Sequence, residues 1–89
     1  MERTEIFSRV KDIVAEVLRV EGNTIQESTN LKNDLGADSL DGLDIDLELD
    51  KCFNITTSQE DLDRINSATV GDIVELVERK LSSKKTKKL

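Results

Sequence analysis

DLGADSLD, residues 34–41, predicts the start of a helix with one hydroxyl group at its mouth. Asp38 suits the N-cap position, because its carboxylate can accept hydrogen bonds from the free amides of a first helical turn. Asp41 follows three residues later, where a capping box places its acid. Gly36 suits a backbone position with positive φ just before the helix. Ser39 is then the first helical residue, and we expect its hydroxyl to be exposed on a rigid element.

The segment that follows, residues 39–53, alternates apolar and acidic side chains, which is also the period of a half-buried strand. The N-cap signal, the scarcity of β-branched residues and the length of the segment favour a helix. With about 100° per residue, its apolar residues divide between two faces. One face holds Leu40, Leu43 and Leu47; the other holds Ile45, Leu49, Cys52 and Phe53. We expect both faces to pack against the core, and an acidic stripe between them, made of Asp41, Asp44 and Glu48, to point outward.

Three further helices are expected from the spacing of the apolar residues. Residues 2–18 form an amphipathic helix that the pair 22–23 ends, residues 58–65 form a short helix that opens with a capping box, and residues 69–81 form the last helix. Residues 23–37 form a long loop, whose predicted anchors in the core are Ile25, Leu31 and Leu35. The fold class is therefore all-α: a four-helix bundle of three main helices and one short helix, with a long loop between the first two helices.

Length and composition limit the organisation of the chain. Its 89 residues suffice for one small domain, and the absence of proline leaves its helices uninterrupted. We assign residues 1–81 to this domain and residues 82–89 to a basic, disordered tail. The chain has neither an apolar run of about 18 residues nor an apolar N-terminal signal region. We therefore expect a cytoplasmic monomer without stable membrane association.

The chemical groups present favour a carrier or binding module over an enzyme. The chain has no histidine, tyrosine or tryptophan and a single cysteine, Cys52. These absences exclude an imidazole base, a Ser-His-Asp triad and the usual zinc sites. A serine hydrolase is disfavoured further, since the motif Gly-x-Ser-x-Gly needs a glycine where Ala37 stands. We expect no catalytic residue, no metal site and, for Cys52, a small apolar role in the core.

Charge is distributed unevenly along the chain. The net charge is −6 although four lysines crowd the last six residues, so the remaining chain is more acidic than this value suggests. Residues 34–50 contain seven acids without an intervening basic residue. Such a surface repels nucleic acid and attracts proteins with basic patches. A calcium-binding loop does not explain the acids, because Gly36 and Gly42 lack acids at the required preceding positions.

The octapeptide 34–41, followed by an acidic helix in a chain of this length, resembles the signature of acyl carrier proteins, in which the serine of Asp-Ser-Leu is esterified with 4′-phosphopantetheine. The resemblance covers about residues 2–81. It implies that Ser39 carries the arm, that a phosphopantetheinyl transferase installs it from coenzyme A, and that its thiol holds acyl groups as thioesters for fatty acid or related synthesis. From the residues alone, a serine that merely helps to cap the helix stays open.

The resemblance also implies two surfaces. A docking site for the transferase and for acyl transferases and synthases with basic patches comprises Asp38, Leu40, Asp41, Asp44 and Glu48; an ordinary solvated helix face is the alternative. An acyl-chain pocket comprises Leu31, Ile45, Leu49, Leu62, Ile65, Ile73 and Leu76; an ordinary core would show the same pattern.

The sequence departs from the family pattern at three places. Gly42 lies inside the second helix, where the family usually has a β-branched or hydroxyl residue, and costs about 1 kcal/mol relative to alanine. Asp46 occupies a usually apolar position, and residues 66–68 lengthen the last connection. An aminoacyl or peptidyl carrier is the nearest alternative function. An unmodified acidic interaction module or divalent-ion binder is the alternative from a different class.

Overall fold

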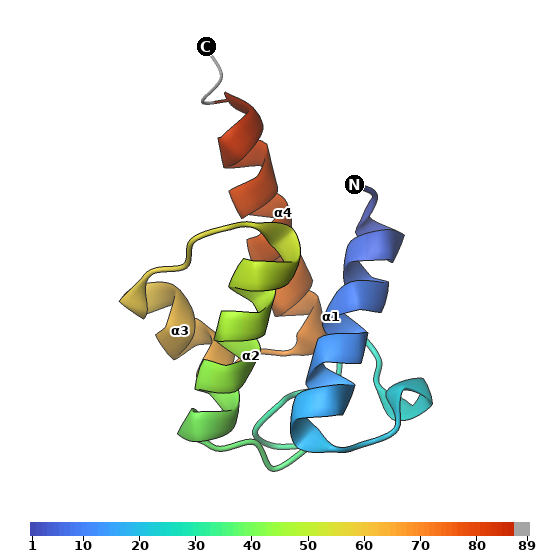
Figure 1. The fold of residues 1–89 in the computed structure, drawn as a ribbon. Coiled ribbons are helices and arrows are strands. Elements are labelled where there is room, and N and C mark those ends of the chain that lie inside the picture. Colours follow the sequence, from blue (N-terminus) through green and yellow to red (C-terminus); the bar gives the residue numbers. More distant parts are fainter. Residues whose placement is uncertain (87–89) are drawn as a thin grey trace.

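The computed structural model describes residues 1–86, which form four α-helices and one 3₁₀ turn (Figure 1). The elements in chain order are α1 (Arg3–Leu18), η1 (Gly22–Thr24), α2 (Ser39–Phe53), α3 (Gln59–Asn66) and α4 (Val70–Thr86). A long loop joins α1 to α2, and a single bridge pairs its residue Asn30 with Thr69. The predicted all-α fold, with three longer helices and one short one, is confirmed.

The helices enclose one apolar core. In Figure 1, α2 lies between α1 and α3, and α4 runs behind it. Each of α1, α2 and α4 contributes side chains that water does not reach, and the loop adds Leu31 in the same environment. The predicted loop anchors are confirmed, since Ile25 and Leu31 are buried and Leu35 packs against the core. The fully buried side chains are Ile6, Val10, Val14, Leu31, Ile45, Leu49, Ile65, Val70, Ile73, Val74 and Val77.

α1 ends at Leu18 as predicted, but the residue that ends it differs from the prediction. Arg19 adopts the left-handed conformation, with φ of 59°, and its N–H donates to the carbonyl of Ala15. This bond satisfies one of the carbonyl groups that a helix end leaves free, so the helix stops there without a glycine. Gly22 begins the short turn η1 instead of ending α1.

One face of α2 does not pack against the core. Leu40, Leu43 and Leu47 are 69%, 39% and 51% exposed, so the prediction that both apolar faces are packed is wrong. Cys52 is also exposed, which corrects its predicted core position. The neighbours of α2 are α1, α3 and α4, and they enclose only the face of Ile45, Leu49 and Phe53. Helical periodicity identifies an apolar face, but only the neighbouring elements determine whether it is covered.

The last helix is longer than predicted. α4 runs to Thr86, whereas the sequence predicted an end near Leu81 and a disordered tail. The domain boundary predicted at residue 81 therefore falls within α4, because a run of polar residues without proline or glycine does not by itself end a helix. Residues 87–89 of that tail lie outside the described residues. Over residues 1–86, no helix combines the length and the apolar character that crossing a membrane requires.

Candidate functional site

Ser39 is the first residue of α2, and its side chain is exposed. The helix start is a reciprocal capping box: the Asp41 N–H donates to Asp38 Oδ1 at 2.9 Å, and the Asp38 N–H donates to Asp41 Oδ2 at 3.1 Å. Both predicted capping residues are confirmed. Two hydrogen bonds therefore hold the backbone on either side of the serine, which keeps its hydroxyl at a defined place on the surface.

The turn before Ser39 is tied to the core. The Ala37 N–H donates to the carbonyl of Leu31 at 2.9 Å, and Leu31 is fully buried. Gly36 has φ of 71°, a left-handed conformation that glycine adopts without the steric cost of a Cβ, as predicted. The loop is held in turn by Leu31 N–H donating to Ala68 O at 3.1 Å. The position of Ser39 thus depends on the core through the loop as well as on α2.

A serine hydroxyl at this place suits attachment of an anionic group. The amides of Ser39 and Leu40 belong to the first turn, which has no intrahelical acceptors for its N–H groups. Together with the positive end of the helix dipole, they favour a phosphodiester at the helix start. The residues present therefore fit 4′-phosphopantetheine.

The predicted docking residues share the outer side of α2. Asp38, Leu40, Asp44 and Glu48 are exposed, and Asp41 is half-buried because it completes the capping box. Among the side chains that the structure describes, one basic group approaches them closely: Lys51 Nζ lies 3.9 Å from Glu48 Oε2, and this lysine is itself exposed. A single exposed ion pair at that distance neutralises little charge. The outer side of α2 therefore combines unpaired acids with the exposed leucines.

A second acidic cluster lies between the middle of α2 and its C-terminal end, where Asp46 is buried and Asp50 is half-buried. Asp46 is 7% exposed and accepts a hydrogen bond from the Thr57 hydroxyl at 2.5 Å. The same hydroxyl lies 3.3 Å from Asp50 Oδ2, and Asp50 Oδ1 is buried without a partner in the described part of the chain. Burial, opposed in part by the Thr57 hydrogen bond and reinforced by the charges of Asp50 and Asp61, raises the pKa of Asp46.

Asp61 lies in the same region, but its carboxylate has hydrogen-bond and ion-pair partners that compensate for its burial. Its carboxylate accepts from the Ser58 N–H at 2.9 Å in the predicted capping box of α3, and Lys80 Nζ lies 2.9 Å away. Burial favours the protonated form, but these hydrogen bonds outweigh it and lower the pKa of Asp61. Sequence reasoning noted that Asp46 occupies a usually apolar position but missed this cluster. The available signal was the position of Asp46 in the helix, which places it on the same side as Ile45 and Leu49.

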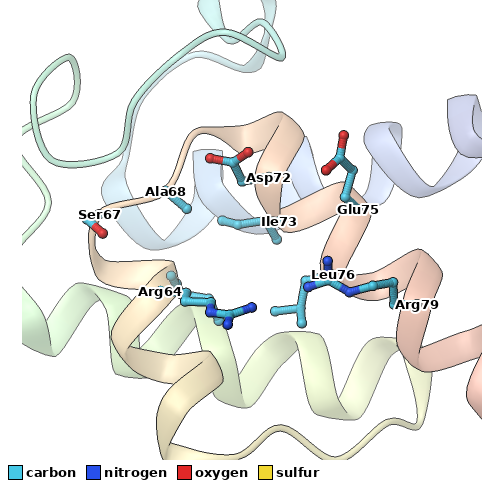
Figure 2. Close-up of a pocket in the computed structure, with 9 residues that line it drawn as sticks. Arg64, Ser67, Ala68, Asp72, Ile73, Glu75, Leu76 and Arg79 are labelled. Atoms are coloured by element: carbon cyan, nitrogen blue, oxygen red, sulfur yellow. The ribbon is translucent and has the colours of Figure 1, made fainter.

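The predicted acyl-pocket residues are brought together in the core. Six of the seven are buried, and Leu62 is half-buried. Three of them also line an open hollow of about 280 Å³ between α3 and α4 (Figure 2). Its apolar floor comprises Ile65, Ala68, Ile73 and Leu76, and the side chains of Arg64 and Arg79 extend across it in Figure 2.

Comparison with known proteins identifies the family. Residues 8–77 match the family model described as the phosphopantetheine attachment site. The chain is 44% identical over 79 residues to the acyl carrier protein of Thermotoga maritima, which covers 89% of this chain and 95% of that relative. The chain belongs to the acyl carrier protein family. It is also 41% identical to the acyl carrier protein of Prochlorococcus marinus, over 90% of this chain and 98% of the relative.

The fold agrees with this assignment. A solved structure of the acyl carrier protein from Enterococcus faecalis matches with a TM-score of 0.73 and 31% identity, covering 90% of this chain and 99% of that one. The protein is therefore an acyl carrier in fatty acid biosynthesis with a 4′-phosphopantetheine prosthetic group. Proteins of this family are carriers rather than enzymes, and they work with synthases and transferases.

Proposed function

We propose that Ser39 is the attachment residue for the arm and that this acyl carrier protein itself catalyses no step. The observation that carries the proposal is the exposed hydroxyl of Ser39 at the first position of a doubly capped helix. The Ser39 hydroxyl attacks the phosphorus atom that bears the pantetheine half of coenzyme A. One phosphoester forms, the phosphoanhydride bond breaks, and the nucleotide half leaves. A transferase supplies the base that takes the serine proton.

In the reactions that follow, the chain positions the bound group and provides the surface that partner enzymes recognise. A group bound at a rigid helix start reaches a partner's active site at raised effective concentration whenever the two proteins dock. The thioester supplies an electrophilic carbonyl when the arm is loaded, and the partner enzymes act on it. The absence of an imidazole in the whole chain supports the assignment of all acid–base steps to those partners.

We further propose that the outer side of α2 is the docking surface. Leu40, Leu43 and Leu47 form an exposed apolar ridge, and the exposed acids Asp44 and Glu48 flank it. An apolar centre with a charged rim is the usual composition of a protein interface. The acids attract partners with basic patches and accelerate association, whereas the ridge supplies contact area. The phosphopantetheinyl transferase and the acyl transferases and synthases are the proposed partners.

The apolar residues between α2, α3 and α4 are the proposed site for a sequestered acyl chain. Ile65, Ile73 and Leu76 support this proposal, because they connect the buried core with the hollow between α3 and α4. Leu31, Ile45, Leu49 and Leu62 complete the proposed lining. The cytoplasmic location and the monomeric state stay predictions from the sequence.

Loading of the purified apo protein tests the attachment residue. With coenzyme A, magnesium and a broad-specificity transferase, we expect the intact mass to rise by one phosphopantetheinyl group. Ser39→Ala is expected to gain nothing, while Ser28→Ala, which alters an exposed serine of the loop, is expected to load like the wild type. A mass gain in Ser39→Ala, or no gain in the wild type, would contradict the proposal and favour an unmodified interaction module.

A further inference from the structure

Gly42 forms a notch on the inner side of α2 that the Asn66 side chain fills. A Cβ built on Gly42 would lie 1.9 Å from Asn66 Oδ1 and 3.0 Å from its Cγ. The first distance is far inside van der Waals contact, so only glycine at this position leaves room for the amide. The departure of Gly42 from the family pattern is therefore explained by the residue opposite it, at the end of α3.

The Asn66 amide in the notch has an unsatisfied hydrogen-bond acceptor. Asn66 Oδ1 is buried and has no hydrogen-bond partner within residues 1–86. A buried acceptor without a partner loses the hydrogen bonds it would make with water. The side chain can therefore leave the notch at low cost, because each hydrogen bond it lacks inside is available outside.

The notch lies between the attachment residue and the proposed acyl site. Ser39, Gly42, Ile45 and Leu49 follow one another at steps of three or four residues, so they lie along one side of α2. Asn66 faces the second of these positions, and the buried Ile65 precedes it on α3. An acyl chain that starts at Ser39 and follows the α2–α3 seam therefore meets the Asn66 amide before it reaches Ile45, Leu49 and Ile65.

We propose that Asn66 is a gate: its amide occupies the Gly42 notch when the core is empty and moves into solvent when an acyl chain enters between α2 and α3. The inference rests on the proposed function, since it requires an acyl chain tethered at Ser39. Asn66 acts as a positioning residue that controls access to the apolar interior. Its polar end lets it exchange between the protein and water, which an apolar side chain at the same place would do at greater cost.

Two substitutions test whether the amide occupies the notch in the apo protein. Gly42→Ala places a Cβ where Oδ1 lies and drives the amide out of the notch, so the lost packing is expected to cancel most of the gain in helix propensity and to leave the melting temperature little changed. In an Asn66→Ala background the nearest atom of residue 66 is its Cα, 3.9 Å from the new Cβ, so the same change is expected to raise the melting temperature through helix propensity. Equal changes in melting temperature in the two backgrounds would overturn the inference, since they would mean that the amide does not occupy the notch. Failure of Gly42→Ala to fold, with a folded double variant, would show that the amide leaves the notch only at high cost and would overturn the gate.

The loaded protein tests the movement. We would attach acetyl or octanoyl pantetheine arms to Ser39 and follow side-chain amide signals by NMR. We expect the Asn66 signals to move to solvent-exposed positions with octanoyl but not with acetyl. Those of Asn33, an exposed loop residue, should stay unchanged in both species.

The remaining outcomes separate the gate from the attachment site. Unchanged Asn66 signals in octanoyl-loaded protein overturn the gate and leave Ser39 as the attachment residue. Movement already with acetyl shows that the arm itself displaces the amide, and it also overturns an acyl gate. Failure to load Ser39 at all overturns the proposed function and this inference together.

Discussion

The two faces of α2 use the same residue types for opposite purposes. On the inner face, Ile45 and Leu49 are fully buried; on the outer face, Leu43 and Leu47 are 39% and 51% exposed. The acids divide in the same way, since Asp46 is buried among other carboxylates while Asp44 and Glu48 face solvent. The comparison teaches that one side of the helix supplies the core, while the other stays available for the docking that we propose. The inner face also carries the Asp46 carboxyl, whose pKa is raised, mainly by burial.

The leucines offer the largest expected difference between the two faces. Leu49→Ala removes a fully buried side chain and is expected to lower the free energy of unfolding by about 2 to 5 kcal/mol. Leu47→Ala is the matched control on the outer face, and its effect should stay within about 0.5 kcal/mol. Urea denaturation followed by circular dichroism measures both. Similar losses for the two variants would mean that the outer leucine is covered in solution.

The buried carboxylate of Asp46 should destabilise the protein near neutral pH. Asp46→Asn keeps an acceptor for the Thr57 hydroxyl and removes the charge, so we expect the free energy of unfolding at pH 7 to rise by about 1 to 2 kcal/mol. The solvent-facing control Asp44→Asn removes an equal charge from the outer face. Its effect should be smaller, since water screens that group.

The pH dependence gives the sign of the Asp46 effect. Its pKa is raised in the folded protein, mainly by burial. Wild-type stability from this group is therefore present below the unfolded pKa, about 3.9, and is lost as the pH rises through the folded pKa. The gap between wild type and Asp46→Asn should widen over that rise. A gap that is constant from acid to neutral pH would indicate that Asp46 is not the titrating group.

Removal of the N-cap of α2 is expected to lower the free energy of unfolding by an intermediate amount. Asp38→Ala removes the acceptor for the Asp41 N–H and should cost about 1 kcal/mol of unfolding free energy. Asp38→Asn keeps a side-chain oxygen and should restore most of this loss, although it removes the same charge. Thermal unfolding of the two variants distinguishes capping from charge. Equal destabilisation by both would show that the negative charge, and not the hydrogen bond, matters at this end.

Neutralising the acids on the outer face of α2 should have the smallest effect, and this effect should appear in the rate of transferase loading. The double variant Asp44→Asn/Glu48→Gln is expected to slow transferase loading about threefold to fivefold at low salt and to load normally at high salt. Asp12→Asn/Glu16→Gln removes two exposed charges at the same spacing from α1 and is the matched control. A salt-independent defect, or an equal defect in the control, would argue against the docking surface on α2.

The local signals in the sequence predicted the parts of the fold that neighbouring residues determine. The capping boxes at Asp38 and Ser58, the positive φ of Gly36 and the bounds of α2 all follow from side chains within a few residues of one another. The end of α1 at Leu18 was also predicted, but its cap at Arg19 was not, because a left-handed cap without glycine leaves no composition signal. The length of α4 escaped it because a polar helix end resembles a tail.

The sequence by itself determined the helices, their starts and the identity of the exposed serine, since hydrogen bonds within one turn and the period of the α-helix are local properties. Only the tertiary structure decided which face of α2 is buried, that Asp46 shares a buried cluster with Asp50 and Thr57, and that Gly42 accommodates Asn66. These features depend on elements that meet in space from distant parts of the chain. Helical spacing gives a side chain its direction, but the packing of the other helices determines what it meets there.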